Sequence, residues 1–539
     1  MNISTVASSI GIPDEALLRY GHDKAKVDLP WLAGQERGDS KLVLVTAMSP
    51  TPPGEGKTTT SIGLADGLRS IGTNAVLALR EPSMGPVFGM KGGATGGGRA
   101  TIVPEADINL HFTGDFAAIA EANNLLSAVI DNHIHFGNGL DIDTRTVSWR
   151  RAIDMNDRSL REIVTSIGSR GNGVIAQSGF DITAASQIMA VFCLAEDVDD
   201  LRERLSKLVV AQNTSGVDVT AGDLGVVGAL TAILKDALSP NLVRTLEGTP
   251  TFVHGGPFAN IAHGCNSVIA TKAALALGDV AITEAGFGAD LGAEKFIDLK
   301  CRKTGLAPAL TVVVATVRAL KYHGGVALAD LEAENVDAVR DGMANLYQHV
   351  ENLKDVFGQN VLVAINAFAT DTAAEHAAIS EALAPLGVDA VVSNHFTDGS
   401  AGAQDLARAV LAHLDEPSTL TFAYEDDASL VQKAEAIATK IYRADKVTWT
   451  AAAKKEVARL QEKYGHLPVC VAKTQYSFAT DKVLGAPRGH SIEIREVRLN
   501  AGAGFVVLIA GSIMTMPGLP KRPAALDIDV VDGQILGIN

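Results

Sequence analysis

A loop rich in glycine and proline, TPPGEGKTT, lies between an apolar run and a segment with helical spacing near the N-terminus. Its residues are Thr51, Pro52, Pro53, Gly54, Glu55, Gly56, Lys57, Thr58 and Thr59. Glycine lets a backbone approach phosphate groups, the first amides of a helix donate to anions, and a lysine at this position reaches the β- and γ-phosphate oxygens. Since the Thr58 hydroxyl can also ligate Mg²⁺, the loop predicts a site for a nucleoside triphosphate with magnesium.

The loop departs from the usual phosphate-loop pattern at one position. That pattern begins with glycine, whereas Thr51 stands there in this chain. The prediction therefore depends on the surrounding order of strand, loop and helix. The alternative is a glycine-rich turn that Lys57 follows by chance.

A second group of cations and glycines follows the apolar run at residues 75–79. Arg80 comes directly after this run, and residues 84–99 hold seven glycines together with Lys91 and Arg99. Backbone without side chains beside such cations suits a loop that binds a small anion. Two alternatives stay open: Arg80 can pair with Glu81 or another carboxylate at a strand end, and the glycine-rich stretch can be a disordered loop of low complexity.

The overall composition narrows the class of protein. The 539 residues include 46 Lys and Arg against 62 Asp and Glu, and this net charge of −16 argues against non-specific binding to nucleic acid or to anionic membranes. No run of about 20 apolar residues indicates a membrane span, and the N-terminus lacks the pattern of a secretory signal. Four dispersed cysteines suit reduced thiols. We therefore expect a cytoplasmic protein.

Short apolar runs alternate with helical segments along much of the chain. Helices are expected at 58–71 and 335–353, and strands at 41–48, 75–79, 280–283, 310–315, 361–365, 390–393 and 420–423. Continuous rather than alternating apolar strands indicate a parallel sheet covered on both faces. We therefore predict an α/β fold with a doubly wound, mostly parallel sheet of the phosphate-loop type. Ligands bind at the carboxyl ends of such strands.

Two segments depart from this alternation. Residues 148–239 carry charged helices at 198–210 and 225–238 around a short strand at 173–182, and the chain beyond 442 turns to β-rich runs at 469–476, 491–497 and 505–509. We therefore predict three domains: a discontinuous nucleotide-binding α/β domain of residues 1–147 and 240–442, an inserted α+β domain of residues 148–239, and a C-terminal β-rich domain of residues 443–539.

Several blocks of the sequence resemble the formate–tetrahydrofolate ligase family. They are the phosphate loop, residues 80–104, DINLHFTGD at 107–115, HGGPFANIAHGCN at 254–266, TEAGFGADLGAEKFIDLKCR at 283–302 and TMPGLP at 515–520. The blocks follow the family order over essentially the whole chain. The resemblance implies an ATP-dependent carbon–nitrogen ligase of one-carbon metabolism, which joins formate to tetrahydrofolate through formyl phosphate and gives 10-formyltetrahydrofolate, ADP and phosphate.

By this resemblance, Lys57 and Arg80 are the principal catalytic cations. Lys57 would stabilise the transferred phosphoryl group, Thr58 or Thr59 would orient the nucleotide with Mg²⁺, and Arg80 would clamp formyl phosphate. Phosphoryl transfer needs charge neutralisation more than covalent help, which suits these residue types. Glu284 and Asp290 are candidate Mg²⁺ ligands, because hard cations take oxygen ligands, although both can equally cap glycine-rich turns.

The resemblance also implies a phenylalanine that stacks on folate, at Phe368 after the run at 361–365. The family usually has a Trp on the opposite face, where this chain has Phe396, and Asp398 replaces a common Lys. Ala369 and Ser512 stand where Pro and Asp are usual. These departures bear on folate affinity and leave the phosphate site untouched. A loop phenylalanine is more often a packing residue than a ligand platform, and this alternative stays open for Phe396.

Two other functions stay open. A nucleotide-switch or partitioning ATPase shares the loop and the sheet, and a degenerate paralogue of the ligase would bind nucleotide without catalysis. The family resemblance further implies a homo-tetramer, activation by a monovalent cation such as potassium or ammonium, and formate and tetrahydrofolate as substrates, the latter with or without a polyglutamate tail.

Replacing Lys57 with alanine tests the phosphate loop. The variant should fold normally and lose nucleotide turnover, because the ammonium that neutralises the phosphates is gone. ADP formation is the measurement, with circular dichroism as the control for folding. Unchanged ATP consumption by a folded Lys57→Ala protein would contradict the assignment.

Overall fold

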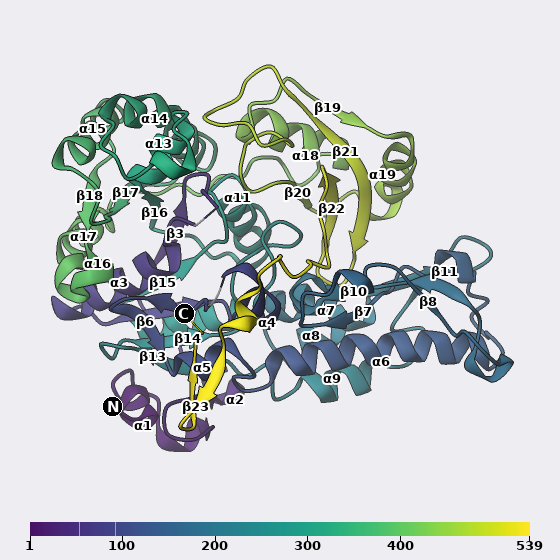
Figure 1. Ribbon diagram of the computed structural model, residues 1–539. Coiled ribbons are helices and arrows are strands. Elements are labelled where there is room, and N and C mark those ends of the chain that lie inside the picture. Colours follow the sequence, from purple (N-terminus) through teal and green to yellow (C-terminus); the bar gives the residue numbers. More distant parts are fainter. Residues whose placement is uncertain (53, 92, 539) are drawn as a thin grey trace.

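A large, mostly parallel sheet lies at the centre of the computed structural model, which describes residues 1–52, 54–91 and 93–538 (Figure 1). The predicted site residue Pro53 lies outside the described residues. Seven adjacent strands are parallel, in the order β14 (Pro250–Val253), β4 (Ala75–Leu79), β15 (Val280–Glu284), β3 (Lys41–Ala47), β16 (Leu310–Ala315), β17 (Val361–Asn366) and β18 (Ala390–Ser393). The predicted α/β class and mostly parallel sheet are confirmed.

Antiparallel strands extend the sheet beyond β14. They are β13 (Asn241–Thr245), β2 (Ala25–Val27) and β1 (Leu17–Arg19), with β6 (Ala100–Val103) and β5 (Gly96–Gly97) pairing beside β13. The glycine-rich stretch after Arg80 therefore ends in a short hairpin on this sheet. Residues 96–97 and 100–103 are thus paired in strands, unlike the disordered loop that composition alone allowed.

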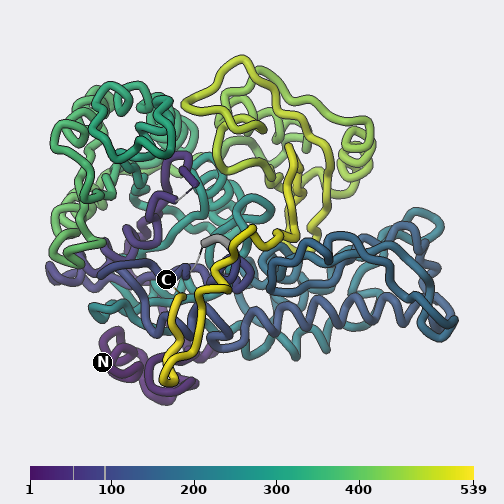
Figure 2. The backbone as a smooth tube through the Cα atoms, in the orientation of Figure 1, coloured from purple at the N-terminus to yellow at the C-terminus, as the bar shows by residue number. Residues whose placement is uncertain are grey.

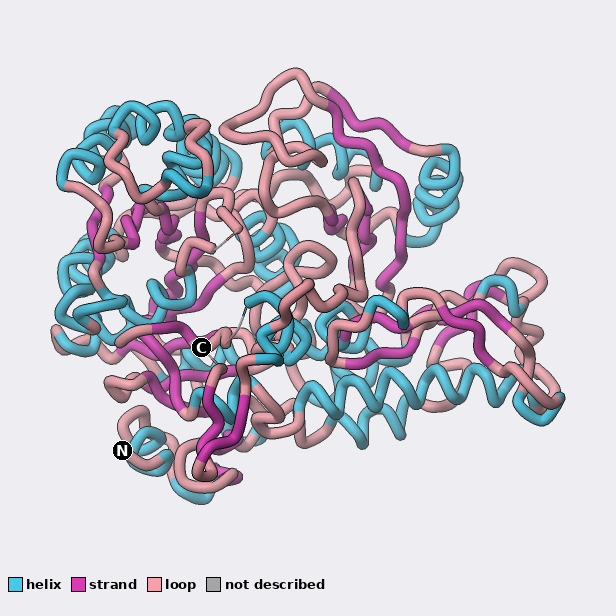
Figure 3. The backbone as a smooth tube through the Cα atoms, viewed as in Figure 1, coloured by secondary structure: helices cyan, strands magenta, loops and turns pink. Residues whose placement is uncertain are grey.

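Both faces of the parallel strands are buried, as the continuous apolar runs predict. Leu42 and Leu44 of β3 join one hydrophobic cluster, whereas Val43 and Val45 join another on the opposite face. The first face is covered by α10 (Val268–Leu277), α13 (Val317–His323) and α14 (Val336–Glu351), and the second by α3 (Lys57–Ser70) and α17 (Ser400–His413). Figure 3 shows the strands running between these helices.

The strand β15 lies between β3 and β4, so the phosphate loop and Arg80 do not leave adjacent strands. Val280 of β15 pairs with Lys41 on one side and with Ala75 on the other. Three parallel strands thus end at the same edge of the sheet. This arrangement brings Glu284, the last residue of β15, between the phosphate loop and Arg80.

Several of the predicted elements are wrong in detail. Residues 420–423 form no strand, because the amides of Thr419 and Thr421 donate to the carbonyls of Gly358 and Phe357, in a loop rather than a sheet edge. The predicted helix at 198–210 is α8 (Val198–Ser206) followed by strand β11 (Val209–Gln212). The predicted strand at 173–182 is interrupted at Gly179, where a Cβ would lie 2.3 Å from the Arg161 carbonyl oxygen.

The segment predicted as an insertion forms an arm along one long helix, α6 (Asp115–His135) (Figure 1). Short sheets lie on it, formed by β7 (Arg151–Ile153) with β10 (Phe180–Ile182), β8 (Ile163–Thr165) with β9 (Ala176–Ser178), and β11 with β12 (Asp218–Thr220). Helices α7 (Gln187–Leu194), α8 and α9 (Val227–Leu234) complete its core. The division into three domains stays a prediction.

A separate four-stranded sheet follows near the C-terminus, in the order β19 (Lys446–Trp449), β21 (Ser491–Asn500), β22 (Phe505–Ala510) and β20 (Val469–Ala472). Helices α18 (Leu430–Ala436) and α19 (Ala451–Tyr464) pack beside it. The chain then returns to the large sheet and ends in the hairpin of β23 (Asp529–Val531) and β24 (Gln534–Leu536) (Figure 2). Within the described residues, no helix is both long enough and apolar enough to cross a bilayer.

A buried ion pair joins the C-terminal sheet to the large one. Lys473 follows β20, and its Nζ lies 2.7 Å from Oδ2 of Asp290, with both side chains inaccessible to solvent. The carbonyls of Thr474 and Ser477 accept the remaining ammonium protons. A buried charge that keeps its partner is tolerated, whereas one that loses its partner is strongly destabilising.

Replacing Lys473 with methionine should therefore lower the free energy of unfolding by about 3–5 kcal/mol, because the Asp290 carboxylate stays buried without its cation. Lys207→Met is the matched control, since Lys207 forms an exposed pair with Glu203 and should cost under about 1 kcal/mol. Thermal melting is the measurement. Equal melting temperatures for the two variants would contradict the role of the buried pair.

Candidate active site

The phosphate loop turns directly into α3, whose first residue is Lys57. Gly54 and Gly56 have φ angles of +85° and +74°, a region that favours glycine. A Cβ on Gly56 would lie 2.4 Å from Nδ2 of Asn366, so a larger residue would displace that side chain. The residue before α3 is Gly56, which has no side chain to cap the helix. This is the geometry that a helix N-terminus offers to a phosphate group.

A buried carboxylate, Glu55, holds the loop in shape. Its Oε1 accepts from both the amide and the hydroxyl of Thr51, each at 2.7 Å. Its Oε2 accepts from the hydroxyl of Thr316, and its backbone carbonyl accepts from Nδ2 of Asn366 at 3.1 Å. Thr51, which departs from the usual glycine, therefore supplies two of the hydrogen bonds that Glu55 accepts.

Glu284 lies between Thr58 and Arg80. The Thr58 hydroxyl donates to Oε2 of Glu284 at 2.9 Å, and Nε of Arg80 lies 3.9 Å from its Oε1. The structure thus brings together three of the predicted site residues from three strand ends. Two oxygen donors beside the start of α3 also fit the preference of Mg²⁺ for oxygen ligands.

Arg80 lies in a cradle of backbone groups. One terminal nitrogen, Nη1, donates to the carbonyl of Pro257 at 3.4 Å and lies 3.1 Å from where a Cβ on Gly286 would stand. Its Nε is buried and has no hydrogen-bond partner among the described residues. One alternative was that Arg80 pairs with Glu81 or another carboxylate at a strand end. Arg80 does lie near such a carboxylate, but it is Glu284, at 3.9 Å. Glu81 is buried instead near Asp115, and burial raises the pKa of Glu81 well above its usual value.

The second candidate magnesium ligand has a different environment. One carboxylate oxygen of Asp290 is occupied by Lys473, so this carboxylate fits a cation less well than Glu284 does. Among the described residues, no group of three or more His, Cys, Asp or Glu side chains is arranged to hold a metal ion. Magnesium ligation by Thr58, Glu284 and Asp290 stays a prediction.

The two phenylalanines predicted for folate follow neighbouring strands. Phe368 comes after β17 and is half-buried, and Phe396 comes after β18 in the helical turn α16 (His395–Asp398) with 49% of its surface exposed. Phe396 lies against the glycine-rich stretch, where a Cβ on Gly98 would stand 2.3 Å from its carbonyl oxygen and 3.0 Å from its ring. The glycines at 97 and 98 are thus explained by close packing. Folate binding by either ring stays a prediction.

Sequence reasoning missed several residues around these side chains. The guanidinium carbon of Arg318 lies 3.7 Å from the centre of the Phe368 ring. His395 is buried beneath α3, its Nδ1 is 2.9 Å from the Ser393 hydroxyl, and burial lowers its pKa to about 4, so it is neutral. A usable signal existed for Arg318, because it follows the predicted strand at 310–315 at its carboxyl end, just as Phe368 follows its own strand.

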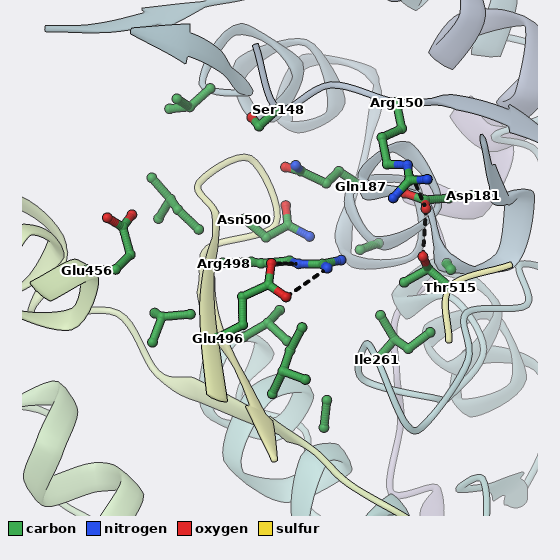
Figure 4. Close-up of a pocket in the computed structure, with 18 of the residues that line it drawn as sticks. Ser148, Arg150, Asp181, Gln187, Ile261, Glu456, Glu496, Arg498, Asn500 and Thr515 are labelled. Atoms are coloured by element: carbon green, nitrogen blue, oxygen red, sulfur yellow. Dashed lines mark hydrogen bonds and ion pairs between the residues drawn. The ribbon is translucent and has the colours of Figure 1, made fainter. Parts of the chain in front are cut away.

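A cavity of about 620 Å³ lies elsewhere, between the arm and the C-terminal sheet (Figure 4). Its three arginines each lie in an ion pair: Arg150 with Asp181, Arg459 with Glu456 and Arg498 with Glu496. Thr515, from the TMPGLP block, closes it by donating to Asp181 at 2.7 Å. None of the described phosphate-loop residues lines the cavity, so we place the candidate active site at the edge of the large sheet.

Comparison with known proteins agrees with the resemblance. The family model for formate–tetrahydrofolate ligase matches residues 1–539. Three relatives carry that same name. The one from a Nocardioides species is 59% identical over 100% of this chain and 97% of its own length. Those from a Methylobacterium species and from Methylibium petroleiphilum are 57% and 55% identical, each over 99% of this chain and 97% of its own length.

Replacing Arg80 with lysine tests whether the guanidinium of Arg80 clamps formyl phosphate. Lysine keeps the charge but loses the planar fork, so we expect a loss of about 10²–10³ in kcat for ADP formation, the size seen when one preorganised donor is removed. Arg408→Lys is the matched control, because Arg408 is 57% exposed and pairs with Asp405 at 2.8 Å. A fully active Arg80→Lys protein would exclude the clamp.

Proposed function

The chain belongs to the formate–tetrahydrofolate ligase family, and from this premise we propose that it uses ATP to join formate to N10 of tetrahydrofolate, giving 10-formyltetrahydrofolate, ADP and phosphate. The observation that carries the proposal is the contact of Thr58 and Arg80 with the same carboxylate, Glu284. It puts Arg80, whose Nε has no hydrogen-bond partner among the described residues, beside the residues that would hold the terminal phosphate of ATP.

Two transfers account for the products. A formate oxygen attacks the γ-phosphorus, the bond to the bridging oxygen breaks, and ADP leaves with that electron pair. N10 of tetrahydrofolate then attacks the carbonyl carbon of formyl phosphate, the carbon–oxygen bond breaks, and phosphate leaves while N10 loses its proton. Lys57 stabilises the charge that spreads over the transferred phosphoryl oxygens, and Arg80 holds the formyl phosphate until N10 reaches it.

The proposal also includes a magnesium ion and several properties of the family. Thr58 and Glu284 would hold Mg²⁺, which supplies neutralisation of the phosphate charge when bound. A monovalent cation such as potassium or ammonium, a homo-tetramer, a cytoplasmic location and a polyglutamate tail on the folate follow from the family resemblance alone.

The folate would lie at the ends of β17 and β18. A flat pterin suits stacking on an aromatic face, and Phe368 is our first choice for that face because it is half-buried and held in place. Phe396 is the second choice, since its ring is partly taken up by packing on Gly97 and Gly98.

Substrate dependence of ADP release tests the function. The ligase reaction requires formate and tetrahydrofolate together for full activity, whereas a nucleotide-switch ATPase would hydrolyse ATP without formate and respond to a macromolecular partner. A degenerate paralogue would bind ATP and release no ADP with either substrate. ADP release should be measured with formate, with tetrahydrofolate and with both, alongside the absorbance of the formylated product. Formate-independent hydrolysis would overturn the proposal.

A further inference from the structure

The guanidinium of Arg318 covers one face of the Phe368 ring, with its central carbon 3.7 Å from the ring centre. Arg318 is the second residue of α13, which starts at the carboxyl end of β16, next to the strand that ends before Phe368. A cation within about 6 Å of a ring centre is attracted by the electrons of that face. A flat guanidinium also stacks on a ring in a way that an ammonium does not.

We propose that Arg318 is a positioning residue for tetrahydrofolate: it fixes the Phe368 ring from one side and leaves the opposite face for the pterin. The inference rests on the proposed function and deepens it, because it names the residue that makes Phe368 a one-sided platform. Arg318 acts through the ring and contributes no group to the reacting atoms.

The backbone under the ring is already fixed. The Phe368 amide donates to Oδ2 of Asp371 at 2.9 Å, and the same carboxylate lies 3.4 Å from Nε2 of His376. This closes the loop after β17 into a tight turn. The remaining freedom is rotation of the side chain, and the guanidinium on its face restricts that rotation.

The helix that carries Arg318 is anchored on two sides. At its start, the Thr316 hydroxyl accepts from the Ala319 amide at 3.0 Å and donates to Glu55 of the phosphate loop. One turn on, Nζ of Lys321 lies 3.0 Å from Oε1 of Glu375, with both side chains inaccessible to solvent. Glu375 belongs to α15 (Ala373–Leu383), the helix that follows the Phe368 loop. The arginine and the ring are therefore held by elements that are bonded to each other.

The platform is also held relative to the phosphate loop. Asn366, two residues before Phe368, donates to the Glu55 carbonyl at 3.1 Å. Glu55 is thus hydrogen-bonded to a residue near each partner of the stacked pair. Thr316 lies two residues before Arg318, and Asn366 lies two residues before Phe368. A folate ring bound on this platform is therefore held relative to the phosphate loop.

Steady-state kinetics of Arg318→Lys and Arg318→Met test the proposal. We expect KM for tetrahydrofolate to rise about 3- to 30-fold, the range of one partly desolvated cation–π contact, while KM for ATP and kcat at saturating folate stay within about twofold of the parent. Arg340→Lys is the matched control, since Arg340 is exposed and pairs with Asp337. A fall in kcat with unchanged folate KM would overturn the positioning role.

A double-variant cycle with Phe368→Ala separates this role from a general structural one. If Arg318 acts through the ring, the Arg318→Met and Phe368→Ala double variant has the same folate KM as Phe368→Ala alone. Additive effects on KM would contradict the proposal. Melting temperatures identify any variant that has lost its fold. If Arg318→Met does not fold, Arg318→Lys replaces it in the cycle.

The same variants separate the role of Arg318 from the folate site in the proposed function. An unchanged folate KM in Phe368→Ala would contradict folate stacking on Phe368. A raised folate KM in Phe368→Ala, with a normal KM in Arg318→Lys, would contradict only the role of Arg318. Comparing mono- with triglutamyl tetrahydrofolate adds a further check. A positioning residue raises both KM values by the same factor, and a larger factor for the triglutamate would mean direct contact with the tail and overturn the proposal.

Discussion

The candidate active site depends on a carboxylate buried inside the predicted phosphate loop. Glu55 is 2% exposed, and burying a carboxylate costs free energy unless hydrogen-bond donors surround it. The amide and hydroxyl of Thr51 and the hydroxyl of Thr316 supply those donors. In doing so they tie the loop to the start of α13, while Asn366 ties it to the end of β17. Glu55 thus sets the positions of the phosphate loop, Arg318 and Phe368 together.

Most of the parallel strands of the large sheet are predictable from local sequence. Continuous apolar runs gave the parallel strands β3, β4, β16 and β18 within a residue of their observed ends, because strands buried on both faces have few alternatives. Residues 420–423 look the same in sequence and form no strand, and the Thr421 amide donates instead to the carbonyl of Phe357 in a loop. Apolar character predicts burial. It does not predict which backbone groups a segment meets.

Strand order and side-chain partners are harder to predict, because they depend on contacts between distant segments. The sequence indicated that Arg80 follows a strand, but not that β15 separates that strand from β3. It marked Phe368 by resemblance and missed Arg318, whose position next to Phe368 follows only from the pairing of β16 with β17. The acidic balance of the chain likewise carried no information about the site, where single cations lie against backbone carbonyls and single carboxylates.

The contacts of Glu55 also bear on how the chain folds as it is synthesised. Thr316 follows Glu55 by 261 residues and Asn366 by 311. At about 5–20 residues per second, a ribosome needs about 15–60 s to make the second of these partners. During that interval the Glu55 carboxylate has only Thr51, from its own loop, among these donors. The loop that carries Glu55 therefore acquires its full set of hydrogen bonds only after the middle of the chain has been synthesised.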